Sequence, residues 1–111
     1  MNATTDELLS RIVDAIVREV DPEQVYLFGS RARGEATDDS DVDLLIVERE
    51  PFSPQRSRRA EMVRLWRLLA PFRTPKDILV FSSDEVNRWR DARNHVIAHA
   101  IREGTLLYER S

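Results

Sequence analysis

The stretch that decides the fold is FGSRARGEATDDSDVDLLIV, residues 28–47. Its last part, 42–47, has the length and apolar character of a buried strand. Two carboxylates, Asp41 and Asp43, nevertheless stand at the start of this strand. Aspartate is depleted in strands, and like charges placed side by side repel each other. The pattern therefore predicts a bound cation that compensates the two charges.

The alternation of side chains along a strand decides where these carboxylates point. Asp41 and Asp43 project from one face because they are two residues apart, and Val42 projects from the other. Leu45 and Val47 follow on the carboxylate face, so the acids stand at the polar end of a strand rooted in the core. We expect them to bind Mg²⁺, which usually takes one or two carboxylates together with substrate phosphates.

A third acidic residue, Asp77, opens a further strand with the sequence DILVF, residues 77–81. On a neighbouring strand it would be a third ligand, and three carboxylates can hold two metal ions. Two metals can activate an attacking oxygen and stabilise a leaving one in phosphoryl or nucleotidyl transfer. An isolated aspartate pair more often ends a loop in solvent. Here the apolar strand, Asp77 and the preceding Gly-Ser turn together favour a metal site.

The Gly-Ser turn, Gly29 and Ser30, follows a short strand and precedes a possible helical turn at 31–34. Glycine lets the backbone approach a phosphate closely, and backbone N–H groups and the Ser30 hydroxyl could donate to phosphate oxygens. Arg31 and Arg33 are candidates for contacts with a triphosphate. A Gly-Ser pair alone is an ordinary strand-to-helix turn, and an arginine is by default solvated.

Helices and strands alternate along the chain. Apolar spacing predicts four helices, over residues 4–20, 54–70, 82–93 and 96–102. It predicts strands over residues 25–28, 41–48, 77–81 and 105–108. We therefore expect one α/β (α+β) domain over residues 1–111, with a mixed sheet of three to four strands packed with helices.

The ends of the helices carry their own signals. Thr4 with Glu7, and Ser82 with Glu85, have the spacing of a capping box at a helix start. Gly104 stands where the last helix is expected to stop. A serine-proline pair at 53–54 predicts the start of the helix that ends near residue 70.

Composition and charge exclude several classes of protein. The net charge of −3 gives no global attraction to nucleic acid or to an anionic membrane, so we expect neither as a partner. The absence of cysteine excludes disulfides, thiolate metal sites and a cysteine nucleophile. The N-terminal segment lacks the pattern of a signal peptide, and no apolar run approaches transmembrane length. We expect a cytoplasmic protein.

Other chemically suggestive residues have simpler explanations. His95 and His99 have a spacing that can bind zinc on a helix, but the stretch HVIAH lacks the glutamate of the zincin motif, and two packed helix positions are favoured. Trp66 and Trp89 are expected in the core. The arginines of residues 56–73 are expected on a solvated helix face, with partner docking as a second possibility and RNA binding as a third.

The central motif resembles that of a known superfamily. Gly29-Ser30, ten residues, then Asp41-Val42-Asp43 is similar to the G-S-x(10)-D-x-D pattern of the DNA polymerase β-like nucleotidyltransferases. The fuller stretch 29–47 resembles the minimal nucleotidyltransferase (MNT) branch, small single-domain proteins often paired as antitoxins with a HEPN-domain toxin. The resemblance covers nearly the whole chain, including the closing AIREGTLLYE at 100–109.

The resemblance implies an Mg²⁺-dependent transfer of AMP from ATP to an acceptor hydroxyl. By position, Asp41 and Asp43 would bind metal and triphosphate, and Asp77 would complete a second metal site. Gly29 and Ser30 would cradle the β and γ phosphates. The acceptor would be a tyrosine of a HEPN-type toxin. The alternative is a non-catalytic antitoxin that neutralises its partner by contact. The nucleotide, the number of AMP units added and the stoichiometry stay open.

Overall fold

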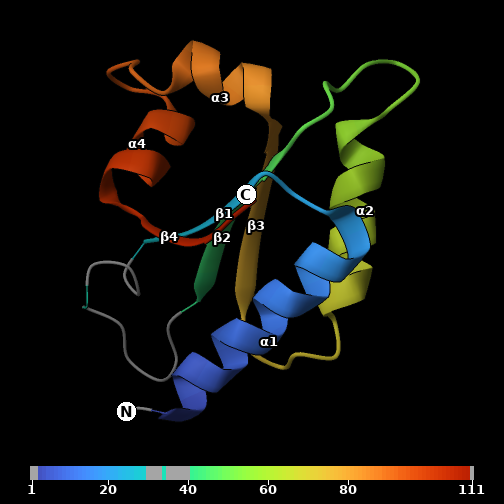
Figure 1. The fold of residues 1–111 in the computed structure, drawn as a ribbon, viewed down its shortest axis with the longest axis vertical. Helices are drawn as coiled ribbons and strands as arrows, with labels where there is room; N and C mark the ends of the chain where they lie inside the picture. Colours follow the sequence, from blue (N-terminus) through green and yellow to red (C-terminus); the bar gives the residue numbers. More distant parts are fainter. Residues whose placement is uncertain (1–2, 30–33, 35–40, 111) are drawn as a thin grey trace.

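The computed structural model of the chain describes residues 3–29, 34 and 41–110 (Figure 1). The helices in this part are α1 (Ala3–Val20), α2 (Arg58–Leu69), α3 (Ser83–Trp89) and α4 (Val96–Glu103). The strands are β1 (Gln24–Phe28), β2 (Val42–Glu48), β3 (Lys76–Ser82) and β4 (Thr105–Glu109). The four helices over residues 4–20, 54–70, 82–93 and 96–102 and the four strands expected from the sequence are present, and the α/β class is confirmed. The possible helical turn at 31–34 lies mostly outside the described residues.

The strands form one mixed sheet in the order β3-β2-β1-β4. β2 runs parallel to β3, whereas β1 runs antiparallel to both of its neighbours, β2 and β4. A parallel pair needs a long crossover, and α2 supplies it between β2 and β3. β2 lies inside the sheet, and helices cover both of its faces. A strand in that position is expected to read as a nearly continuous apolar run, as residues 42–47 do.

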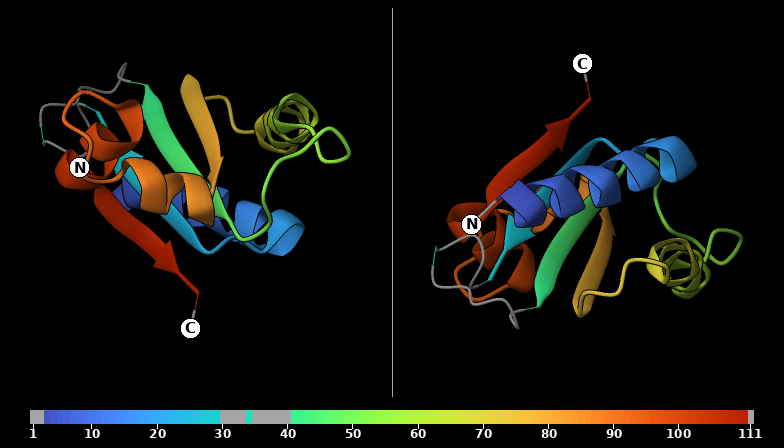
Figure 2. Two further views of the ribbon diagram at one scale, coloured as in Figure 1. Left: turned by 90° about the horizontal axis from the view of Figure 1, so that it is seen from above. Right: turned by 90° about the horizontal axis from the view of Figure 1, so that it is seen from below.

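Helices cover the two faces of the sheet in pairs (Figure 2). α1 and α2 pack on one face through a buried cluster that includes Ile12, Ile16, Leu65, Leu69, Val42, Leu44 and Ile46. α3 and α4 pack on the other through Val86, Ile97, Ala100, Tyr26, Leu45 and Val47. Alternate residues of β2 therefore enter opposite clusters. The predicted alternation is confirmed, and Asp43 lies on the face that Leu45 and Val47 share.

The start of α2 differs from the prediction. The helix begins at Arg58 rather than at residue 54, and Ser57 is its N-cap, with its side chain accepting from the backbone N–H of Ala60. Ser53 and Arg56 instead exchange two backbone hydrogen bonds in a tight turn. The physical reason lies outside the local sequence. The Arg56 side chain reaches Glu48 at the end of β2, and this contact holds residues 53–56 away from a helical path.

The two tryptophans are not core residues, which corrects that expectation. Trp66 on α2 and Trp89 at the end of α3 are each 40% exposed. The buried positions of α2 are Leu65 and Leu69, and Trp66 lies beside this stripe rather than in it. Trp89 stacks on His95, with ring centroids 4.6 Å apart. That stacking ties together the two ends of the segment between α3 and α4.

The helix ends confirm one capping box and not the other. Ser82 and Glu85 make both reciprocal bonds of a capping box at the start of α3. α1 begins at Ala3, so Thr4 does not occupy the position before the helix that its predicted box requires. α3 is also shorter than expected, because it ends at Trp89. In the described part of the chain, none of the helices is both long and apolar enough to cross a bilayer.

Gly104 ends α4 for a reason different from the one expected. Its φ of −87° is not left-handed, so the usual glycine stop does not apply. A Cβ at this position would lie 2.2 Å from the carbonyl oxygen of Ala100 and 2.8 Å from that of Leu27. Glycine is needed here because the chain leaves α4 close to that helix's own Ala100 carbonyl and close against β1.

Candidate active site

Asp43 and Asp77 are paired neighbours in the sheet. They are register partners in the parallel ladder of β2 and β3, so their Cα atoms are separated by the strand spacing of about 4.8 Å. Residues in register on adjacent strands point to the same face. The next residues on that face, Leu45 and Leu79, are also register partners and share one apolar cluster. The structure thus brings together two of the three predicted carboxylates.

Asp41 stands just outside the strand. It is exposed and immediately precedes Val42, whose side chain is buried on the opposite face of the sheet. The backbone N–H of Val42 donates to the carbonyl of Pro75 at 2.8 Å, which fastens the start of β2 to the segment that leads into β3. This hydrogen bond places Asp41 at the same end of the sheet as Asp77.

Gly29 ends β1 against the same carboxylates. Phe28 is the register partner of Asp43, so the next residue, Gly29, turns the chain directly beside it. Its φ is +73°, a conformation that L side chains rarely adopt. A Cβ on Gly29 would lie only 2.2 Å from Oδ2 of Asp43. Glycine is required twice over, by the backbone conformation and by the space that the Asp43 carboxylate occupies.

The predicted phosphate contacts of Ser30, Arg31 and Arg33 lie outside the described residues. The two residues of the turn that are described, Gly29 and Gly34, both have positive φ angles, of 73° and 75°. The contacts of Ser30, Arg31 and Arg33 stay predictions.

The residues present fit a divalent cation such as Mg²⁺. Asp43 and Asp77 offer hard carboxylate oxygens from two adjacent strands, and the missing Cβ of Gly29 leaves room for an Asp43 oxygen. Among the described residues, no three acidic or histidine side chains form a ready group of metal ligands. The participation of Asp41, and with it the second metal ion, is therefore a prediction.

Lys76 supports the site and was missed by the sequence reasoning. Its ammonium group donates to the carbonyl oxygens of Phe72 at 2.5 Å and Thr74 at 2.9 Å. Burial lowers the pKa of this side chain. It closes the loop that positions Asp77, the next residue. The available signal was that Lys76 is the sole lysine in a chain whose other basic residues are arginine.

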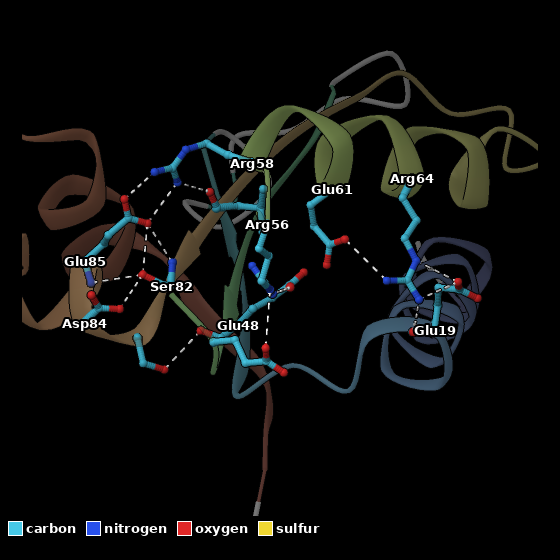
Figure 3. Close-up of polar contacts among 12 residues, drawn as sticks. Glu19, Glu48, Arg56, Arg58, Glu61, Arg64, Ser82, Asp84 and Glu85 are labelled. Carbon is cyan, nitrogen blue, oxygen red and sulfur yellow. Dashed lines mark hydrogen bonds and ion pairs between the residues drawn. The ribbon is translucent and has the colours of Figure 1, made fainter. Parts of the chain in front are cut away.

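The histidines and two of the arginines have structural partners. His95 precedes α4 and accepts from the backbone N–H of Ile97 through Nδ1, so it is a cap rather than half of a helical pair with His99. Arg58 pairs with both carboxylate oxygens of Glu85 and donates to the carbonyl of Val80 (Figure 3). Arg56 and Arg58 therefore anchor α2 rather than form a solvated face.

A buried carboxylate, Glu48, lies at the far end of β2. Glu48 is 3% exposed and receives a hydrogen bond of 2.5 Å from Arg56 (Figure 3). Burial, together with the adjacent Glu61 carboxylate, raises the pKa of Glu48 to about 8. Glu48 lies five residues from Asp43, about 17 Å along the strand. This group is therefore separate from the candidate active site.

Comparison with known proteins decides the family. The sequence model described as polymerase beta, nucleotidyltransferase, matches residues 10–111. The chain belongs to the polymerase β nucleotidyltransferase family. The superfamily resemblance of the Gly29–Asp43 motif is thereby confirmed. Among curated proteins, none matches the sequence with statistical significance.

Solved structures share the fold of this family member. A candidate nucleotidyltransferase from Sulfolobus solfataricus is 28% identical, with a TM-score of 0.64 over 94% of this chain and 79% of that one. A toxin–antitoxin structure with AMP-PNP matches at 17% identity and a TM-score of 0.56, over 90% and 73% of the two chains. A structure of a tri-AMPylated Shewanella oneidensis HEPN toxin in complex with MNT antitoxin matches at 15% identity and a TM-score of 0.58. The match covers 95% of this chain and 72% of that one. These likenesses show that the chain shares its fold with these proteins.

Proposed function

We propose that this protein is an Mg²⁺-dependent nucleotidyltransferase that moves AMP from ATP to a hydroxyl group of a HEPN-type partner protein, and that it acts as that partner's antitoxin. The observation that carries the proposal is the register pairing of Asp43 with Asp77, together with the close approach of the Gly29 backbone to the Asp43 carboxylate. A structural domain gains nothing from adjacent like charges in a sheet, whereas a metal–nucleotide site needs them.

The reaction would be a displacement at the α phosphorus of ATP. The acceptor oxygen forms a bond to that phosphorus, the bond to the bridging oxygen of the β phosphate breaks, and pyrophosphate leaves. The proton of the acceptor hydroxyl passes to solvent. Bound Mg²⁺ would supply charge neutralisation of the triphosphate and of the attacking oxygen.

Each residue of the site has a role in this proposal. Asp41 and Asp43 hold the nucleotide-bound metal and the triphosphate. Asp77, on a separate strand, orients the acceptor oxygen and its metal. Gly29 lets the backbone approach the phosphates, and Ser30 donates to them together with its neighbours Arg31 and Arg33.

The partner is proposed from two observations. The fold matches structures of toxin–antitoxin complexes, one with AMP-PNP and one with an AMPylated HEPN toxin. The site is also open: Asp41 and Asp77 are both exposed, so an acceptor as large as a protein can approach them. An exposed site of this kind suits a hydroxyl presented on a protein surface.

The test is the intact mass of the cognate HEPN-type protein after incubation with Mg²⁺, ATP and this protein. We expect the mass to rise by whole AMP units, and the rise to disappear with Asp43→Asn. A protein that blocks the toxin's activity without changing its mass would establish the contact-only antitoxin instead. Failure to bind the partner at all would overturn both.

A further inference from the structure

A hollow of about 730 Å³ lies between the end of α1 and the outer face of α2. We call it the α2 groove, and its lining includes Glu19, Arg59, Val63, Arg64, Arg67 and Leu68. It lies on the side of α2 that faces away from the sheet, because the buried residues of this helix, Leu65 and Leu69, point the other way. The groove is thus a surface feature distinct from the candidate active site.

The centre of the α2 groove is apolar. Val63, which lines the groove, is 42% exposed, and Trp66, one turn further along the same helix but outside the lining, is 40% exposed. Ala60 and Leu68 add further apolar surface to the lining. Large apolar side chains that adjoin one another on one helix are a usual mark of a protein-binding surface.

The rim of the groove is positive on a protein that is negative overall. Arg59 and Arg67 are exposed, and neither makes an ion pair within residues 3–29, 34 and 41–110. Arg64 is held by Glu19 through both its carboxylate and its carbonyl (Figure 3). Two unpaired guanidinium groups therefore flank the apolar centre, although the whole chain carries a charge of −3.

The groove leads toward the candidate active site. Figure 1 shows α2 running toward the end of the sheet at which β3 begins. Residues 70–75 then connect α2 to β3, and Lys76 and the Val42–Pro75 hydrogen bond hold that connection at the start of β2 and β3. A protein bound along α2 therefore has its nearer end beside the acidic residues.

We propose that the α2 groove docks an amphipathic helix of the partner protein, with acidic residues at its edges and apolar residues at its centre. This inference rests on the proposed function, because the partner is the protein whose hydroxyl group enters the site. A hollow between two helices fits a third helix, and α2 offers a length of about 18 Å. The occupant's carboxylates pair with Arg59 and Arg67, and its apolar face covers Val63 and Leu68 and reaches the neighbouring Trp66.

A protein helix fits this surface better than nucleic acid. Phosphate recognition needs a positive surface that follows the nucleic-acid backbone. Here the centre of the groove is apolar, and Arg64, the arginine nearest α1, is already neutralised by Glu19. The two remaining charges, Arg59 and Arg67, lie one turn before and one turn after Val63 on α2, as the polar rim around the apolar centre of a protein interface does.

The experiment compares binding of the cognate HEPN-type protein by wild type and by Arg59→Glu/Arg67→Glu. We expect the dissociation constant to rise on the order of 10- to 100-fold, because two attractive contacts become repulsive. Arg88→Glu/Arg93→Glu, the same charge change at exposed positions near the other pair of helices, is the matched control and should bind as wild type does. All four positions are exposed, so circular dichroism and melting temperature should confirm intact folds.

The outcomes separate this inference from the proposed function. Wild-type binding that both double variants retain equally would overturn the docking surface and leave the transferase proposal standing. If the two double variants weaken binding equally, the effect comes from net charge alone, and the docking surface is also overturned. Competition by a single-stranded RNA oligonucleotide for the groove would assign the surface to nucleic acid. Absence of wild-type binding would remove the partner and the groove's role together.

Discussion

Oδ2 of Asp43 occupies the space that a side chain on Gly29 would need: the position of a Cβ on this glycine lies 2.2 Å from that oxygen. Gly29, the residue that follows β1, is therefore in close contact with Asp43, the first acidic residue of β2. The same carboxylate pairs in register with Asp77. Its position depends on both neighbours, and each can be tested separately.

Gly29→Ala should abolish Mg²⁺–ATP binding, whereas Gly34→Ala should preserve it. Both glycines have positive φ, so both changes should cost about 1–2 kcal/mol of stability through backbone strain. Only the Gly29 change also pushes the Asp43 carboxylate aside, because nothing lies within 4 Å of a Cβ on Gly34. Urea unfolding and isothermal titration with Mg²⁺–ATP measure the two effects. Equal nucleotide affinity in both variants would contradict the role given to this contact.

Asp77→Asn should separate nucleotide binding from transfer. Asp41 and Asp43 can still hold the nucleotide-bound metal, while the acceptor oxygen loses its orienting group. We expect nearly unchanged affinity for Mg²⁺–ATP and a fall in AMP transfer on the order of 100-fold or more. Intact mass of the partner over time gives the rate.

The apo protein should not lose stability in Asp77→Asn, because the change removes a like charge beside Asp43. Asp91→Asn, the same chemical change at an exposed position after α3, is the matched control and should transfer AMP at the wild-type rate. If Asp77→Asn also transfers at that rate, Asp77 does not belong to the site.

Mg²⁺ and ATP together should stabilise the fold more than either does alone. At ten times its dissociation constant a ligand adds about 1.4 kcal/mol. For a domain of this size that raises the melting temperature by roughly 5–10 °C. Differential scanning fluorimetry with ATP plus Mg²⁺, and with ATP plus EDTA, measures the difference. The same rise under both conditions would argue against a metal-dependent site.

Stability should fall as the pH rises from about 5 to 8 because of Glu48. Its pKa is raised from 4.5 to about 8 in the folded protein by burial and by Glu61. The folded state therefore keeps a proton that the unfolded chain has already lost. The contribution is fully present below pH 4.5 and is lost as the pH approaches 8, with a slope of up to about 1.4 kcal/mol per pH unit. Chemical denaturation at intervals of pH measures it.

Glu48→Gln should flatten this dependence, since an amide does not titrate. Glu50→Gln, at a side chain that is 77% exposed and two residues away, should leave the slope as it is in wild type. Glu85 does not interfere. Its pKa is lowered chiefly by Arg58, so its contribution is lost only as the pH falls below the ordinary carboxylate range. An unchanged slope in Glu48→Gln would mean that another group carries the pH dependence.

The central strand and its acids could be predicted because their signals are local. The alternation of residues 42–47 sufficed to place Asp43 with Leu45 and Val47 on one face, and the apolar run after Asp77 sufficed to identify a second strand. The register that pairs Asp43 with Asp77 could not be predicted from the sequence, because the parallel pairing depends on how the α2 crossover packs.

Features that depend on distant contacts escaped the sequence reasoning. Ser57 rather than Ser53 caps α2 because Arg56 is drawn to Glu48. Trp66 is apolar and was therefore expected in the core, but the residues of α2 that are buried are Leu65 and Leu69. Gly104 was recognised as a helix end, yet glycine is needed there because a Cβ would lie too close to the carbonyl oxygens of Ala100 and of Leu27, the latter 77 residues earlier in the chain.

The parallel ladder between β2 and β3 has a consequence for the order of folding. Its strands cannot pair by closing a hairpin, because residues 49–75, with α2, must first span the sheet from one end to the other. Long-range pairing of this kind forms late, after the entropy of a large loop has been overcome. Asp43 and Asp77 therefore come together only in a chain that has nearly finished folding. A ligand that needs both acids will therefore not bind partly folded chains. Recovery of its binding during refolding will report formation of the native state.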